Sequence, residues 1–120
     1  MTAQETFAHA LKLPARVAIY VPSTTDVNSE NTEVAEKMTE KVAEQLSSLF
    51  GGATIAPASG AWVSDVYGLV RERVNIVYAF GLREQIDAAA EKLLALAENV
   101  KNTMRQEAVS VELDGALYLV

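Results

Sequence analysis

The spacing of hydrophobic residues changes along the chain, and two stretches carry the period of a helix. In the first stretch, apolar residues recur every three or four positions, which places them on one helix face. They are Val34, Met38, Val42, Leu46 and Leu49. A second, longer stripe runs from Ile86 to Met104. These patterns predict a helix over 32–50 and a longer helix that Gly81 opens.

The ends of these helices carry recognisable capping residues. Asn31 or Thr32 is suited to cap the first helix, because short polar side chains accept hydrogen bonds from the first free N–H groups. Glu84 occupies the position that a capping-box carboxylate would take in the second helix.

Between the helices, short runs of β-forming residues predict strands. The first strand covers 16–21 and the longest covers 69–80. A second, short strand covers 53–57 and continues at Trp62–Ser64 beyond a break at 58–61. Near the end of the chain, Asp114-Gly115 is a strong two-residue turn signal, which predicts a hairpin of 109–113 with 116–120.

Alternation along the longest strand predicts which side chains share a sheet face. Side chains two residues apart lie on the same face. We expect Val74, Ile76, Tyr78 and Phe80 to face the helices, with Glu72 at the edge of that set. A carboxylate there needs a basic partner, and Arg16 or Arg83 is suited to provide one.

The order of predicted elements is β-α-β-β-α-β with one additional strand. This order predicts an α+β, ferredoxin-like domain, in which one antiparallel sheet carries two helices on one face. Residues 1–15 are expected to form an N-terminal arm, and 16–120 a single domain. The alternative is another α+β sandwich, in which the last hairpin is placed differently.

In the ferredoxin-like arrangement the second sheet face has no helix, and its predicted residues are too apolar for a solvated surface. We interpret this face as a homodimer interface. Its predicted residues are Tyr20, Arg71, Arg73, Val77, Leu117 and Leu119. The alternative is that the N-terminal arm folds back and covers the face with Phe7 and Leu11.

Composition narrows the possible functions. Ten basic and sixteen acidic residues give a formal net charge of −6, which disfavours nucleic-acid binding and suits a basic protein partner. The chain has no cysteine and only one histidine, His9, so no metal site, cofactor or catalytic residue is predicted. Neither a signal peptide nor an apolar run of about 20 residues occurs, so a cytoplasmic location without a membrane span is expected.

Two groups of residues are candidates for ligand binding. Ser23 and Thr24 bring hydroxyls to the loop before the first helix, although that loop lacks the glycines and lysine of a phosphate loop. A second group lies in and beside the neighbouring strands and is expected to cluster: Trp62, Tyr67, Glu72 and Tyr78. In both groups the alternative is a structural role, in turns and capping or in packing.

Four segments of the chain resemble a family of short uncharacterised bacterial proteins, some of them encoded on mobile elements. The segments are Val21-Pro-Ser-Thr24, Leu49-Phe-Gly-Gly-Ala-Thr54, Gly60-Ala-Trp62 and Leu69-Val-Arg-Glu-Arg-Val74. The resemblance covers 16–120 and implies no activity or cofactor. It implies that Ser23, Thr24, Trp62 and Glu72 lie in the recurrent segments of that family.

Two functional hypotheses follow. The first is a non-enzymatic binding or interaction protein that acts as a homodimer and contacts another protein. The alternative is a small-molecule-binding protein, or a cofactor-free enzyme of the dimeric α+β barrel type, with a pocket near Trp62 and Tyr78.

Overall fold

A five-stranded antiparallel sheet forms the body of the protein, in the strand order β4-β5-β1-β6-β7. The computed structural model describes residues 1–25, 29–30 and 32–120, and the expected cap at Asn31 lies outside them. The strands of this sheet are β1 (Ala15–Pro22), β4 (Thr54–Ser64), β5 (Gly68–Gly81), β6 (Ser110–Leu113) and β7 (Ala116–Leu119). The remaining elements are α1 (Ala3–Thr6), β2 (Thr24–Thr25), β3 (Ser29–Glu30), α2 (Thr32–Phe50) and α3 (Arg83–Thr103).

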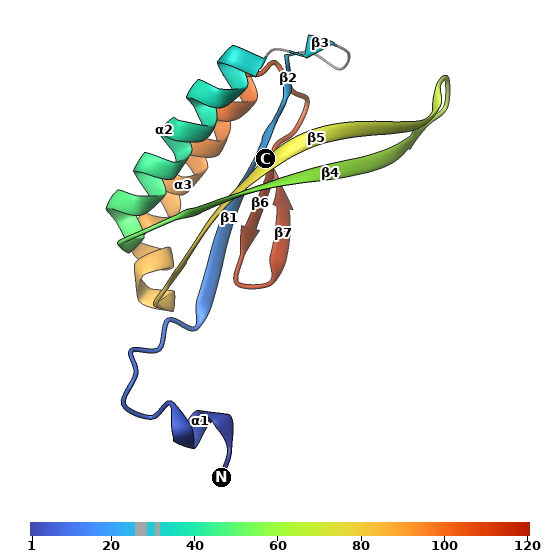
Figure 1. Cartoon of the computed structure of the whole chain (residues 1–120). Coiled ribbons are helices and arrows are strands. Elements are labelled where there is room, and N and C mark those ends of the chain that lie inside the picture. The colour runs from blue at the N-terminus through green and yellow to red at the C-terminus, as the bar shows by residue number, and fades with distance from the viewer. Residues whose placement is uncertain (26–28, 31) are drawn as a thin grey trace.

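The predicted fold class is confirmed. The two long helices, α2 and α3, lie side by side on one face of the sheet, and no helix of the described residues covers the opposite face (Figure 1). The element order from β1 to β6 is the ferredoxin-like β-α-β-β-α-β, and β7 extends the sheet beside β6. The β6–β7 hairpin turns at Asp114 and Gly115, whose φ angles of 49° and 89° are those that a tight two-residue turn requires.

The hydrophobic core fills the space between the helices and the sheet. β1 contributes every second residue to it, and both helices contribute the predicted apolar stripes. Fully buried examples are Val17, Ile19, Val42, Leu46, Leu93 and Val100. Each such side chain stabilises the fold by roughly 1.5–3 kcal/mol relative to an exposed position.

The predicted faces of β5 are inverted in the structure. Val77 is fully buried in the core, and Asn75 donates a hydrogen bond from its side chain to Thr39 of α2. Val77, Arg71 and Arg73 therefore lie on the helix-facing side of the strand, so the prediction that they belong to the helix-free face is wrong.

The physical reason for the inversion is the size of the side chains near the end of β5. Small residues, Ala79 and Gly81, face the helices, and Phe50 of α2 packs against Gly81. The bulky Tyr78 and Phe80 must then project from the opposite side. Since the strand is apolar at both parities from Ile76 to Phe80, hydrophobicity alone did not determine its faces.

Two further predictions need correction. The predicted break at 58–61 is absent, because β4 pairs with β5 without interruption from Thr54 to Ser64. Pro57 is tolerated there because β4 is an edge strand. At the start of α3, the side chain of Gln85, rather than Glu84, accepts a hydrogen bond from the Leu82 N–H at 2.7 Å.

Two segments project from the body. Since β1 begins at Ala15, the N-terminal arm comprises residues 1–14, which are all exposed and point away from the sheet (Figure 1). The far parts of β4 and β5, residues 61–71, form a two-stranded ribbon that we call the finger. These projections account for a radius of gyration of 16.0 Å, against about 13.6 Å expected for a compact domain of this length.

The arm does not cover the helix-free face of the sheet. Phe7 is 69% exposed and Leu11 is 84% exposed. In this chain the alternative in which these residues shield that face is therefore not realised. No helix among the described residues has the length and apolar character needed to cross a lipid bilayer.

Gly81→Ala tests the close approach of α2 to the sheet. An added Cβ would meet Cδ1 of Phe50 at 2.8 Å and Oε1 of Gln85 at 3.0 Å. We expect a loss of about 1–3 kcal/mol in the free energy of unfolding, measured by urea denaturation. Gly52→Ala is the matched control, because nothing lies within 4 Å of its added Cβ. Equal stability of the two variants would contradict the packing described for Phe50.

Candidate functional site

The face of the sheet without helices, which we call the open face, brings together most of the predicted site residues. Strand pairing places Tyr20 opposite Ile76, and Gly60 opposite Glu72. It places Leu117 opposite Glu112 and Leu119 opposite Ser110 on the β6–β7 hairpin. Side chains that are paired directly across an antiparallel sheet lie on the same face. The open face therefore carries Tyr20, Trp62, Glu72, Tyr78, Leu117 and Leu119.

A charged cluster occupies the middle of the open face. Nε of Arg16 lies 3.1 Å from Oε2 of Glu112, and the guanidinium of Arg16 lies 4.2 Å from the centre of the Tyr78 ring. The hydroxyl of Tyr20 donates a hydrogen bond to the other carboxylate oxygen of Glu112, at 3.3 Å. The side chains of Arg16 and Glu112 are 33% and 23% exposed, so this ion pair is partly shielded from water. The cluster holds Tyr20 and Tyr78 in fixed positions on a surface that is otherwise largely apolar.

Tyr20 is the titratable group that this cluster perturbs. Burial raises the pKa of Tyr20 above its ordinary value of 10.0, and the negative charge and hydrogen bond of Glu112 raise it further, while Arg16 lowers it. The protonated phenol is thus the form that the folded protein favours. Its contribution to stability is complete below pH 10.0 and is lost as the pH rises through the folded pKa.

Glu112→Gln is expected to lower the pKa of Tyr20, because it removes the negative charge and weakens the hydrogen-bond acceptor. The measurement is an ultraviolet titration of tyrosinate, in which the Tyr20→Phe variant identifies the Tyr20 component. Glu91→Gln is the control, because Glu91 is an exposed carboxylate on α3. It should leave the pKa of Tyr20 unchanged. If Glu112→Gln left the pKa of Tyr20 unchanged, the hydrogen bond between Tyr20 and Glu112 would not form in solution.

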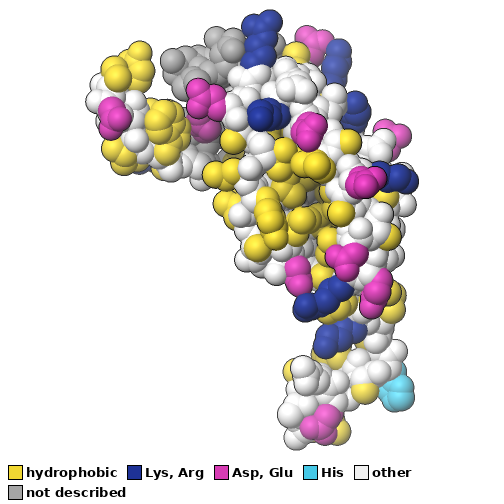
Figure 2. All heavy atoms as spheres, turned by 180° about the vertical axis from the view of Figure 1, so that it is seen from behind, with side chains coloured by type: hydrophobic (Ala, Val, Ile, Leu, Met, Phe, Trp, Pro, Cys, Tyr) yellow, Lys and Arg dark blue, Asp and Glu magenta, His cyan; other side chains and the backbone are white. Residues whose placement is uncertain are grey.

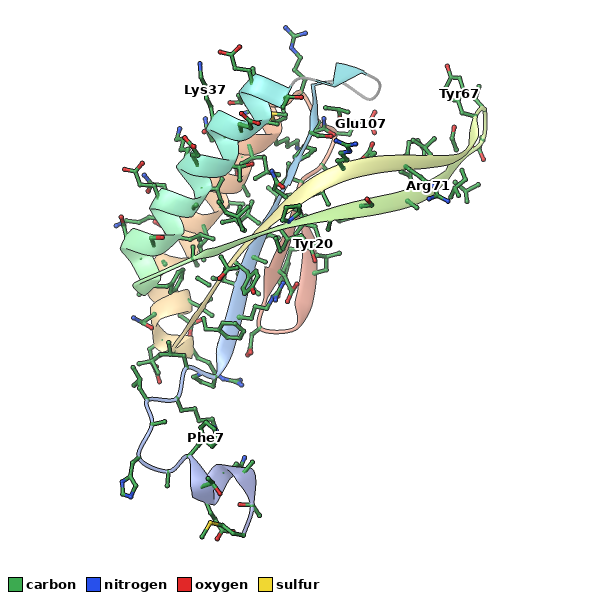
Figure 3. The ribbon with its side chains drawn as sticks, in the orientation of Figure 1. Phe7, Tyr20, Lys37, Tyr67, Arg71 and Glu107 are labelled. Atoms are coloured by element: carbon green, nitrogen blue, oxygen red, sulfur yellow. The ribbon has the colours of Figure 1, made fainter. Side chains whose placement is uncertain are left out.

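A pocket of about 240 Å³ lies on the open face at the base of the finger. Its walls combine two aromatic rings, Tyr20 and Trp62, with the carboxylate of Glu72 and the polar side chains of Gln106 and Ser110. Trp62 is 43% exposed. Tyr20 comes from the central strand β1 and lies near the middle of the sheet in Figure 3. The pocket is therefore partly enclosed by the protomer and open on the side that faces away from the helices.

The polar groups of the pocket are mainly hydrogen-bond acceptors. Nε2 of Gln106 donates to the carbonyl oxygens of Thr24 at 2.9 Å and Met104 at 3.0 Å, which uses both of its N–H groups. Its Oε1 is the polar atom that remains for a ligand. Within the described part of the chain, the Glu72 side chain has no ion pair or hydrogen bond, and no lysine or arginine lines the pocket. An aromatic, acceptor-rich pocket with a carboxylate favours a cationic ligand.

The predicted ligand-binding residues divide between different places. Trp62 and Glu72 meet in the pocket, as expected, although Glu72 reaches it from the open face and not from the core edge. Tyr78 lies on the same face but packs under Arg16. Ser23 lines a separate cleft beside α2. Thr24 contacts the site indirectly, through the bond from Gln106 to its carbonyl oxygen.

The expected partners of Glu72 are engaged elsewhere. Arg16 pairs with Glu112, and Nη1 of Arg83 lies 3.0 Å from Oδ2 of Asp114. Sequence reasoning also missed Gln106, which follows α3 and carries no motif. Its neighbour Arg105 has a φ of 51°, an unusual angle for a residue with a side chain, and this turn carries Gln106 to the pocket.

The finger presents an apolar surface next to the pocket. Val63, Val66 and Tyr67 are 72–78% exposed, and Leu69 is 57% exposed. The turn is held by Oγ of Ser64, which accepts hydrogen bonds from the N–H groups of Val66 and Tyr67. Hydrophobic side chains gather at the tip of the finger and in the middle of the body in Figure 2, with charged side chains around them.

The described residues contain no group of three or more His, Asp or Glu side chains placed to hold a metal ion. His9 lies exposed in the N-terminal arm, which Figure 2 shows projecting away from the body.

Comparison with known proteins identifies a fold and no family. No protein-family model matches the chain, and no curated protein matches it. A solved phage SAM lyase in complex with S-methyl-5'-thioadenosine has a TM-score of 0.61 and 20% identity, over 88% of this chain and 88% of that chain. The phage SAM lyase in its apo state has a TM-score of 0.60 and 16% identity, over 88% of this chain and 87% of that chain.

CutA from Synechococcus elongatus has a TM-score of 0.47 and 14% identity, over 88% of this chain and 80% of that chain. At such identities the likeness is one of fold alone. The chain thus shares the α+β, ferredoxin-like architecture of the phage SAM lyase structures.

Proposed function

We propose that the chain is a small-molecule-binding protein that associates with copies of itself, at its simplest as a homodimer, and binds an organic cation in the pocket on the open face. The observation that carries the proposal is the composition of the pocket. Glu72 has no partner in the described part of the chain, Tyr20 and Trp62 supply aromatic rings, and no basic side chain is present. A cation would balance the carboxylate and pack against the rings.

The class of cation that deserves the first test is a sulfonium nucleoside. The phage lyase of similar fold was solved with S-methyl-5'-thioadenosine, and its name states that it acts on SAM. SAM carries a positive sulfonium, whereas S-methyl-5'-thioadenosine is a neutral thioether. The two compounds share the thionucleoside, and SAM adds the sulfonium charge together with an amino-acid chain, so their comparison separates binding of the nucleoside from binding of these added groups.

Self-association is supported by the amount of apolar surface around the pocket. Leu117 and Leu119 are 58% and 71% exposed on the open face, and Phe80 is 45% exposed. At the base of the finger Trp62 is 43% exposed on the same face, and an isolated two-stranded ribbon is only marginally stable in water. A second copy packed on the open face would bury these side chains and close the outer side of the pocket.

Glu72→Gln is expected to weaken SAM binding by roughly tenfold, equivalent to about 1.4 kcal/mol, because it removes the carboxylate that faces the cation. Binding of S-methyl-5'-thioadenosine should change much less. Isothermal titration calorimetry of both compounds provides the measurement, and Glu91→Gln is the charge-matched control outside the pocket. If neither compound binds the wild-type protein, or if both lose affinity equally in Glu72→Gln, the cation site is not the one proposed.

Leu119→Glu is expected to convert the assembly to a monomer in gel filtration with light scattering, because it places a charge in the apolar β7 part of the proposed interface. Leu119 is highly exposed in the single chain and pairs with Ser110, so the folded protomer should tolerate the change. Leu94→Glu is the control, since Leu94 is 49% exposed on α3, away from the open face. If the wild-type protein is a monomer, self-association is refuted. A different protein would then be the expected partner of the open face.

A cofactor-free enzyme is the second candidate, and the fold shared with a SAM lyase favours it. The same samples test it. Release of S-methyl-5'-thioadenosine from SAM, followed by chromatography and lost in Glu72→Gln, would extend binding to catalysis. Intact SAM after prolonged incubation would restrict the protein to binding.

A further inference from the structure

A second hollow, separate from the pocket on the open face, lies where the first turns of α2 approach β4 and β5. It has a volume of about 450 Å³, within the usual range of small-molecule sites. Ser23, Glu36, Arg73 and Asn75 line it. We propose that this hollow, which we call the α2 cleft, binds a small zwitterion of the α-amino acid class.

Two opposite charges face the α2 cleft without neutralising each other. Within the described residues, neither Arg73 nor Glu36 takes part in an ion pair, whereas the nearby Lys37 pairs with Glu33 at 3.2 Å. A ligand with a carboxylate and an ammonium group satisfies both at once. A guanidinium binds a carboxylate with two parallel hydrogen bonds, and a carboxylate binds an ammonium through charge-assisted bonds. A purely anionic ligand would be repelled by Glu36, and a purely cationic ligand would be repelled by Arg73.

The amide of Asn75, which lines the α2 cleft, is fixed by a buried hydroxyl. Thr39 is only 4% exposed, and its Oγ1 donates a hydrogen bond to the carbonyl oxygen of Ala35 at 2.7 Å. The same Oγ1 accepts a hydrogen bond from Nδ2 of Asn75 at 3.2 Å. This chain orients the amide of Asn75 and leaves its carbonyl oxygen and one N–H for a ligand.

The backbone around the α2 cleft is held by regular structure. The Ser23 N–H donates to the carbonyl oxygen of Arg73 at 3.1 Å, which ties the end of β1 to β5. Arg73 pairs with Ser59 in the β4–β5 ladder, and Glu36 and Thr39 belong to the same helix. Groups held on strands and helices keep their geometry better than groups on loops. Pro57 and Ala35 supply an apolar wall, which suits an uncharged side chain on the amino acid.

The test is a titration of the nitrogen-15-labelled full chain with L-leucine, followed by two-dimensional NMR. The side-chain amide of Asn75 is the main reporter, because it lines the α2 cleft and is fixed by Thr39. We expect saturable shifts of this amide and of the Ser23 backbone amide. Acetate and methylammonium, each with one of the two charges, should produce little change at the same concentrations.

Matched variants separate the α2 cleft from general charge effects. Arg73→Gln and Glu36→Gln should each weaken L-leucine binding by roughly tenfold, the effect of losing about 1.4 kcal/mol. Arg71→Gln and Glu40→Gln are the controls, because they lie on the same strand and the same helix but do not line the α2 cleft. Shifts of the same size with acetate alone, or no saturable shift with L-leucine, would overturn the proposal. Neither result depends on the open-face pocket, which SAM titration tests separately.

Discussion

The contact between Phe50 and Gly81 is the constraint on which the arrangement of both sheet faces depends. Phe50 lies so close to Gly81 that a methyl group at that position would meet its ring at 2.8 Å. This contact, together with Ala79 two residues earlier, fixes which side of β5 faces the helices. Val77 is then buried, and Val74, Ile76, Tyr78 and Phe80 must project from the open face. The same choice carries Glu72 out of the core and places it beside Trp62 and Tyr20.

The consequence is a sheet with two chemically different faces and a ligand site proposed for each. On the helix-facing side, beyond the core, β5 presents Arg73 and Asn75 to the α2 cleft. On the open face, the same strand presents Glu72 to a pocket that no basic side chain among the described residues lines. The Arg16–Glu112 pair lies near this pocket and is internally neutral, so it positions Tyr20 without cancelling the charge of Glu72. Successive side chains of β5 point to opposite faces of the sheet. The strand therefore contributes to the acceptor-rich pocket on the open face and to the α2 cleft, with its two opposite charges, on the other face.

The sequence predicted the structure correctly where a pattern is compatible with only one local structure. The apolar stripes of α2 and α3 and the Asp114-Gly115 turn each specify a local structure, and the order of elements then specifies the fold. The sequence was uninformative along β5, because residues 76–80 are apolar at both parities. In this stretch only the small size of Ala79 and Gly81 separates the two faces. Trp62 and Glu72 were predicted together because they lie on adjacent strands. Gln106 could not be predicted, since an unusual backbone angle at Arg105 brings it to the pocket.

In the proposed assembly the open face is buried against a second copy of the chain, and its pocket lies at this interface. Trp62 is the only tryptophan and lines that pocket, so its fluorescence reports on the interface directly. In the single chain it is 43% exposed. We expect an emission maximum at shorter wavelength in the wild-type protein than in Leu119→Glu, because assembly removes water from the indole. An identical, solvent-like emission maximum in both proteins at every concentration would contradict the claim.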